Sequence, residues 1–348
     1  MIRTVLSLFD GMSCGQIALR ENGQTFERYY ASEIDKKAIE QTKLNFPDTI
    51  QLGDITRWRE WDIDWSQVDL ILAGSPCQGF SSAGLGLNFS DPRSKLYFVF
   101  EDILKFAQTQ NPDVKFLLEN VRMSLENMSV ITRRLRLYPV NIDAARVSAQ
   151  HWERFYWTNL RTKRDETLNI DVVDIPQPAD RNIVLRDILE ENVPEDYFLS
   201  DNKVLHLTNG SNRISGLTVS STGLRPFKND GRNGSLSEYG TMAFDTQKCG
   251  TLTTTNTPKV VIQVGNLVNG AGFKNPQRGR VYAIEGKCPT LTAGSGGALE
   301  PKLLIVIDDK TYRIRRMTPG EMSKAQSIPE WYVWACAKTQ VQKMTGNG

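Results

Sequence analysis

Residues 68–79, with the sequence Val-Asp-Leu-Ile-Leu-Ala-Gly-Ser-Pro-Cys-Gln-Gly, decide the fold of this chain. The first six residues are apolar and β-prone, which predicts a buried strand of a parallel sheet. The strand ends at Gly74, because Pro76 and Gly79 prevent a helix from following at once. We therefore expect Cys77 on a stiff loop just outside the carboxyl end of a strand, where open α/β sheets place their chemistry.

The thiol of Cys77 has two interpretations. It can be a nucleophile, because a thiolate is strongly nucleophilic and its pKa responds to its surroundings. It can equally be a small buried apolar side chain, which is the commoner state of a free cysteine. The Pro-Cys-Gln sequence alone does not separate the two.

Length and composition indicate an ordinary globular protein. The 348 residues allow one large and one smaller domain, and 40% hydrophobic with 24% charged residues is typical of soluble proteins. The formal net charge of +2 gives no general affinity for a polyanion. A nucleic-acid surface therefore has to come from local clusters of basic residues.

The cysteines and histidines argue against disulfides and against a structural metal. The five cysteines are scattered without a CxxC pair, and only His151 and His206 are present to complete a zinc site. This pattern predicts a reduced, cytoplasmic protein without a metal ion. The chain enters a strand directly and has no apolar run of roughly 18 residues, so we expect neither a signal peptide nor a membrane partner.

The first half of the chain alternates between strand-like and helix-like segments. Expected strands are residues 5–9, 29–32, 49–52, 68–73 and 115–118. Expected helices are residues 16–22, 36–45, 95–108 and 124–137. Such alternation predicts an α/β fold with a doubly wound, mostly parallel sheet.

The composition changes after about residue 170. A Pro-rich linker at 175–178 and a short helix at 184–191 lead into short β-like runs separated by Gly, Asn, Ser and Thr. Two similar segments, at 249–253 and 288–292, each contain Thr-Leu-Thr. We expect a first domain over 1–170, a smaller β-rich domain over 171–310, and a return to the first domain over 311–348, with a helix at 319–326.

The turn after the first strand, Phe9-Asp10-Gly11, begins a Phe-x-Gly-x-x-x-Gly pattern. Its glycines allow a ligand to approach the backbone, although many α/β proteins have such a turn for packing alone. Glu33 and Asp54 close the second and third strands, where a carboxylate can hold ribose hydroxyls. Because the GxGxxG spacing is absent, the pattern favours a nucleoside without a pyrophosphate over NAD or FAD.

Glu119 begins the loop after the fifth strand and should face the same crevice as Cys77. A single glutamate at a strand end is more often a helix cap or a surface charge. Beside a nucleophilic cysteine, however, a glutamate that shares a proton suits attack on an electron-poor ring.

Together these segments resemble the cytosine-C5 DNA methyltransferase family over nearly the whole chain. The matching segments, in order, are Phe9-Asp10-Gly11, Glu33, Asp54, Pro76-Cys77-Gln78, Glu119-Asn120-Val121, residues 150–154 and residues 316–329. Residues 6–11 and 147–160 look like the animal de novo enzymes. The Thr-Leu-Thr segments are similar to recognition regions of phage and restriction–modification enzymes.

The resemblance implies a Rossmann-like fold, S-adenosyl-L-methionine as cofactor and double-stranded DNA as partner. It implies base flipping, with Cys77 attacking C6 of cytosine, Glu119 at N3, and Arg154 steadying the base. The implied cofactor residues are Phe9, Asp10, Gly11, Met12, Ser13, Glu33, Ile34, Asp54, Ile55, Pro76, Leu96 and Asn347. Basic, Gly-rich loops within residues 201–310 would contact DNA, although an ordinary solvated surface is the usual meaning of such loops.

Two features depart from the family pattern. Trp152 replaces the first arginine of the Gln-x-Arg-x-Arg motif, so one implied contact to the backbone or base lacks its residue, while Arg154 remains. Residues 345–348 resemble the opening of the tenth motif without the helix that follows it. The resemblance therefore implies that a C-terminal helix or a second polypeptide completes the cofactor site.

Three alternatives stay open on the sequence alone. The same scaffold serves an RNA cytosine-5 methyltransferase, although the basic segment before residue 311 favours duplex DNA. Trp152 allows a catalytically impaired DNA-binding relative, against which Cys77 and Glu119 argue. Transfer of a modified group from a cofactor analogue is the third.

Overall fold

The computed structural model describes residues 1–75, 95–167, 169–199, 219–220, 223–224, 263–266, 279–291, 300–306 and 312–347. Its main feature is a seven-stranded sheet in the order β3-β2-β1-β4-β5-β8-β7. The strands are β1 (Ile2–Leu8), β2 (Phe26–Ser32), β3 (Ile50–Gln51), β4 (Val68–Gly74), β5 (Lys115–Val121), β7 (Val140–Asp143) and β8 (Glu153–Thr158). The first five are parallel, and β8 is antiparallel to both β5 and β7.

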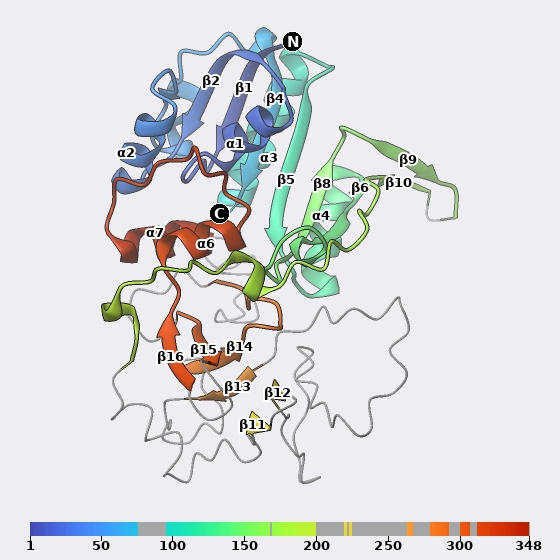
Figure 1. The fold of residues 1–348 in the computed structure, drawn as a ribbon. Helices are drawn as coiled ribbons and strands as arrows, with labels where there is room; N and C mark the ends of the chain where they lie inside the picture. Colours follow the sequence, from blue (N-terminus) through green and yellow to red (C-terminus); the bar gives the residue numbers. More distant parts are fainter. Residues whose placement is uncertain are drawn as a thin grey trace.

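Helices cover both faces of this sheet (Figure 1). They are α1 (Cys14–Glu21), α2 (Lys36–Asn45), α3 (Lys95–Gln110) and α4 (Leu125–Leu135), with 3-10 turns η1 (Ile55–Glu60) and η2 (Trp65–Gln67). Leu6 and Ile71 pack in the core with α3, whereas Val5 and Leu70 pack on the opposite face. Burial on both faces is the reason that the strands read as continuous apolar runs.

The predicted fold class is therefore confirmed, with differences at the ends of elements. Phe9 was expected to end the first strand but lies outside it, with a left-handed φ of 60°. The helix expected at 184–191 is only the 3-10 turn η5 (Leu185–Ile188), which begins where Asp187 accepts from the backbone N–H of Val184 at 2.7 Å. The antiparallel strands β7 and β8 were not predicted.

The second part of the chain contains a four-stranded sheet in the order β13-β14-β15-β16. Its strands are β13 (Gln263–Asn266), β14 (Arg280–Ala283), β15 (Lys302–Val306) and β16 (Tyr312–Arg316). Two shorter sheets consist of β6 (Leu137–Tyr138), β9 (Thr162–Asp165) and β10 (Ile170–Val173), and of β11 (Val219–Ser220) with β12 (Gly223–Leu224). The segment at 249–253 lies outside the described residues, as do the expected basic loop residues Arg225, Lys228, Arg232, Lys274 and Arg278. Arg280, also expected on a loop, is the first residue of β14.

The last described segment of the chain packs against the turn after β1. Helix α6 (Pro319–Ala325) begins with a capping box in which Thr318 and Glu321 bond each other's backbone. Tyr332 donates its hydroxyl to the carbonyl of Met12 at 2.8 Å and packs with it in one apolar cluster. Helix α7 (Lys338–Asn347), which was not predicted, adds Met344 to that cluster.

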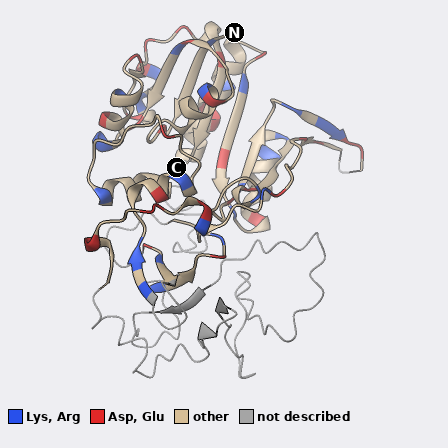
Figure 2. Ribbon diagram, in the orientation of Figure 1, with Lys and Arg blue, Asp and Glu red and all other residues tan. Residues whose placement is uncertain are grey.

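Figure 2 shows basic residues along β16. Each of the three arginines of this strand has a hydrogen-bond or ion-pair partner. Arg313 is paired with Glu195, Arg316 donates to the carbonyl of Asp196 at 2.5 Å, and buried Arg315 bonds Glu321 at 2.6 Å. These contacts join the small sheet to the 3-10 turn η6 (Glu195–Tyr197) and to α6. Within the described residues, no helix has the length and apolar character needed to span a membrane.

Candidate active site

The turn after β1 folds tightly around its backbone. Phe9, Gly11 and Ser13 all have positive φ, at 60°, 58° and 69°. A left-handed conformation is unfavourable for a bulky residue such as Phe9, and such strain is concentrated at functional sites. The backbone N–H of Gly11 donates to Glu33 at 2.8 Å, which ties the turn to the end of β2.

Asp10 is buried beneath this turn. Its Oδ1 accepts from the hydroxyl of Tyr29 at 2.9 Å, whereas Oδ2 has no hydrogen-bond partner in the described part of the chain. Burial raises the pKa of Asp10 to about 6, although the hydroxyls of Ser7, Ser13 and Tyr29 act to lower it. An unpartnered carboxyl oxygen at a ligand turn indicates a place for a donor from a ligand.

The ends of β2 and β3 bring Glu33, Ile34 and Asp54 to the same edge. Glu33 accepts from the backbone N–H groups of Ile34 and Asp35 at 2.8 Å, so its carboxylate is fixed. The side chain of Ile34 is 72% exposed, which is unusual for a large apolar residue in a folded protein. Asp54 follows Gly53, whose carbonyl accepts from Ser32 at 2.8 Å, and it caps η1.

The remaining expected cofactor residues are placed less directly. The side chains of Met12 and Ser13 are buried, so only their main chain can face a ligand at this turn. Ile55 is also buried, and partly buried Leu96 packs on the main core. Asn347 is the last residue of α7 and is exposed, while Pro76 lies outside the described residues.

Glu119 lies at the carboxyl end of β5, directly opposite Gly74 in β4. A Cβ atom added to Gly74 would come within 3.3 Å of Oε2 of Glu119, so glycine allows this close approach. The next residue, buried Asn120, donates to Oγ of Ser75 at 2.8 Å. Asn120 thus fixes the last described residue before the loop that carries Cys77; Cys77 itself lies outside the described residues.

Arg154 in β8 joins Glu119 at this edge. Its Nε lies 2.6 Å from Oε1 of Glu119, and its guanidinium carbon lies 3.8 Å from the centroid of the Trp152 ring. Desolvation raises the pKa of Glu119, and the positive charge of Arg154 opposes that rise. A carboxyl group whose pKa is raised holds a proton more readily than an exposed glutamate does, which suits it to proton donation.

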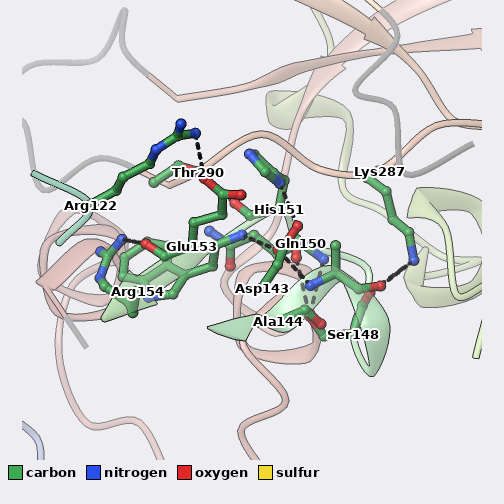
Figure 3. A network of polar contacts seen from close by, with 12 residues as sticks. Arg122, Asp143, Ala144, Ser148, Gln150, His151, Glu153, Arg154, Lys287 and Thr290 are labelled. Carbon is green, nitrogen blue, oxygen red and sulfur yellow. Dashed lines mark hydrogen bonds and ion pairs between the residues drawn. The ribbon is translucent and has the colours of Figure 1, made fainter. Parts of the chain in front are cut away.

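A polar network connects this pair with the second part of the chain (Figure 3). Asp143 bonds the ring of His151 at 2.9 Å, and the backbone N–H of His151 donates to the carbonyl of Cys288 at 2.9 Å. The hydroxyl of Thr290 donates to the carbonyl of His151 at 2.8 Å. Sequence analysis did not assign functions to Asp143 or Thr290. Thr290 is 139 residues from its partner His151, and the bond between Asp143 and His151 depends on the fold of the loop between β7 and β8.

The doubly wound sheet, with polar residues gathered at its carboxyl edge, defines a Rossmann-like α/β protein. Comparison with known proteins identifies it further. Residues 3–348 match the C-5 cytosine-specific DNA methylase family, and the chain belongs to that family. The resemblance drawn from its motifs is thereby confirmed.

Individual relatives agree with this assignment. The chain is 29% identical to the orphan methyltransferase M.Rho11sI of Bacillus phage rho11s, over 86% of this chain and 69% of that protein. It is 26% identical to the type II methyltransferase M.HhaI of Haemophilus parahaemolyticus, over 98% of this chain and 89% of that protein. A mutant DNMT2 of Spodoptera frugiperda shares the fold, with a TM-score of 0.58 at 17% identity, over 99% of this chain and 95% of that one.

Proposed function

We propose that this protein transfers the methyl group of S-adenosylmethionine to C5 of a cytosine in double-stranded DNA, through a covalent bond between Cys77 and C6. The observation that carries the proposal is the Glu119–Arg154 pair over Gly74, directly beside the entrance to the Cys77 loop. Membership of the C-5 cytosine-specific DNA methylase family supports a shared role for these groups in methyl transfer.

The turn after β1 fits S-adenosylmethionine on three observations. Oδ2 of Asp10 lacks a partner among the described residues, Ile34 offers an exposed apolar surface for adenine, and Glu33 is held rigidly at the end of β2. Glu33 would hold the ribose hydroxyls and Asp54 the adenine amino group. When bound there, the cofactor supplies an electrophilic methyl group on sulfur.

Cys77, Glu119 and Arg154 would each have a distinct role in the reaction with cytosine. The thiolate of Cys77 adds to C6, and Glu119 holds a proton at N3, so that electron density moves to C5 and this carbon becomes nucleophilic. After C5 accepts the methyl group, loss of the C5 proton to a base breaks the bond between C6 and sulfur and releases Cys77. Arg154 steadies the ring and the developing charge.

The target base has to leave the duplex before any of these steps, because C6 and N3 are inaccessible in a base pair. We propose residues 171–310 as the segment that recognises the DNA sequence, with basic side chains on phosphate and a few side chains on base edges.

The test is methyl transfer to duplex DNA and to RNA, together with trapping on DNA that contains 5-fluorocytosine, whose C5 cannot lose a proton. We expect the unmodified chain to methylate DNA and to form a denaturation-resistant adduct. Cys77→Ser should lose both activities and still bind S-adenosylhomocysteine, while Glu119→Gln should slow transfer by roughly 10²–10⁴-fold. Full activity of Cys77→Ser would exclude the covalent mechanism, and preference for RNA would reassign the substrate.

A further inference from the structure

Trp152 occupies the position where the motif resembled by residues 150–154 has an arginine. Its side chain is 7% exposed, and the guanidinium of Arg154 lies over its ring, with 3.8 Å between the guanidinium carbon and the ring centroid. Trp152 directly precedes β8, of which Arg154 is the second residue, and the stacking contact brings the two side chains together.

Arg154 is held on three sides. The ring of Trp152 covers one face of the guanidinium, Nε lies 2.6 Å from Glu119, and Nη1 donates to the carbonyl of Glu153 at 2.9 Å. Glu153 itself pairs with Arg122 at 3.0 Å, as Figure 3 shows. The backbone of Arg154 is paired with Val121 in β5 and with Ile142 in β7, and of the three described side-chain contacts the one with Glu119 directs the guanidinium to the carboxyl edge of the sheet.

Trp152 is in turn fixed through its backbone. Its N–H donates to Oδ1 of Asp143 at 3.1 Å, and its carbonyl accepts from Ala144 at 3.1 Å. The same Asp143 carboxylate bonds the ring of His151. These bonds fix the main chain from which the buried indole extends.

The charge of the residue at this position matters. A second arginine would place two cations side by side, and each would compete for Glu119. The indole carries no charge and attracts a cation to its face, most strongly when both groups are shielded from water. It stabilises one orientation of Arg154 without adding charge beside Glu119.

We propose that Trp152 is a positioning residue, whose ring face holds the guanidinium of Arg154 on Glu119. The inference rests on the proposed function in one respect, namely that Glu119 and Arg154 act on the cytosine. Trp152 does not contact the substrate in this assignment; it acts through Arg154.

The test compares Trp152→Leu with Trp152→Phe, which retains an aromatic face, and with Trp157→Phe as a matched control. Trp157 is a buried tryptophan within β8, the strand that carries Arg154, and its ring N–H is bonded to Thr132 rather than directed to the site. We expect Trp152→Leu to lower kcat by roughly 5–30-fold with little change in cofactor KM, and Trp152→Phe to restore most of the rate.

The pH dependence of kcat supplies a readout that a purely structural effect would not change. When Arg154 is free to leave Glu119, the pKa of Glu119 rises further, so the alkaline limb of the profile should move to higher pH in Trp152→Leu. Among the described residues, Glu119 also influences the pKa values of Cys14 and Tyr156. Burial first, and then neighbouring carboxylates, raise the pKa of each, so both stay neutral across the assay range.

Two results would overturn the inference. One is a normal rate and a normal pH profile in Trp152→Leu. The other is a lower rate in Trp152→Leu, Trp152→Phe and Trp157→Phe that is fully explained by a smaller fraction of folded protein in each variant. Glu119→Gln, measured in parallel, separates this failure from that of the proposed function. If Glu119→Gln is fully active, the proposed function fails; if it is inactive while Trp152→Leu is normal, only the role of Trp152 fails.

Discussion

Asp10 is the side chain whose chemistry conflicts most with its position in the fold. It is 8% exposed, and one of its two carboxyl oxygens has no partner in the described part of the chain. Burying a charged oxygen without a hydrogen bond is destabilising, and the raised pKa is the consequence. A residue that destabilises the free protein in this way is typical of a ligand site, where the ligand supplies the missing donor.

We expect Asp10→Asn to stabilise the protein at neutral pH. The pKa of Asp10 rises from 3.8 to about 6 on folding, so its contribution to stability is present below pH 4 and lost as the pH rises through 6. The difference corresponds to roughly 3 kcal/mol in the free energy of unfolding. Urea unfolding should show Asp10→Asn as the more stable protein at pH 8, with an advantage that shrinks toward pH 4.

The same variant should bind S-adenosylhomocysteine more weakly, by roughly 1–3 kcal/mol in calorimetry, because an amide cannot replace a charged acceptor. The exposed carboxylate of Asp113 provides the control, and Asp113→Asn should change neither quantity. If the free energies of unfolding of Asp10→Asn and of the unmodified chain differ by the same amount at every pH, folding does not raise the pKa of Asp10.

At the scale of elements, the sequence predicted the parallel part of the sheet well. Continuous apolar runs such as residues 68–73 identify strands buried on both faces, and β1, β4 and β5 lie where they were expected. Glu119 was expected to begin the loop after residues 115–118, whereas β5 includes it and continues to Val121. Strands β7 and β8 were missed because Glu153, Arg154 and their neighbours mix charged and aromatic residues without alternation.

Other parts of the site could not be read from local patterns. The bonds of Asn120 to Ser75 and of Asp143 to His151 depend on how strands are paired, and no spacing in the sequence reports that. Helix α7 was missed because its sequence contains few apolar residues. Its two large apolar side chains, Val341 and Met344, are buried. Its packing against Met12 is a tertiary contact.

The loop between β7 and β8 should make stability depend on pH through Asp143. Burial acts to raise the pKa of Asp143, but bonds from His151 and from backbone N–H groups lower it to about 2. This contribution, about 2 kcal/mol, is present above pH 4 and lost as the pH falls toward 2. The bond with Asp143 raises the pKa of His151. The histidine therefore stabilises the folded protein at low pH, and this stabilisation is lost as the pH rises through the raised pKa of His151.

We therefore expect Asp143→Asn to unfold about 2 kcal/mol more easily at pH 6, and to lose less stability than the unmodified chain between pH 6 and 8. His151→Gln should show the same flattening. Parallel stability curves for the variant and the unmodified chain would mean that the two side chains are not coupled.

For the whole molecule, the decisive question is how the second part of the chain is held against the first. Lys287, which precedes β15 and is 1% exposed, donates to the carbonyls of Ala145, Ser148 and Ile183 at 2.7, 3.2 and 2.5 Å. Ala145 and Ser148 belong to the loop that leads to Trp152. Lys287 is adjacent in sequence to Cys288 and three residues before Thr290, on the other side of the network. Figure 3 shows the lysine reaching across to this loop.

We expect Lys287→Met to weaken the connection between the two parts more than it weakens either one. The methionine fills most of the volume but leaves three buried carbonyls without a donor, which costs about 1–3 kcal/mol for each carbonyl that water does not reach. Calorimetry should show a lower melting temperature with a broadened or divided transition. Because the turn after β1 is remote from Lys287, affinity for S-adenosylhomocysteine should change little, while affinity for duplex DNA should fall.

Lys302 provides the matched control. It is also buried, and it donates to the carbonyl of Glu300 at 2.8 Å within the small sheet. Lys302→Met should therefore destabilise the small sheet without dividing the transition into separate melting of the two parts. If Lys287→Met instead melts in one sharp transition and binds DNA as the unmodified chain does, the coupling between the two parts must come from other contacts, of which the bond from Thr290 to His151 is the first to remove.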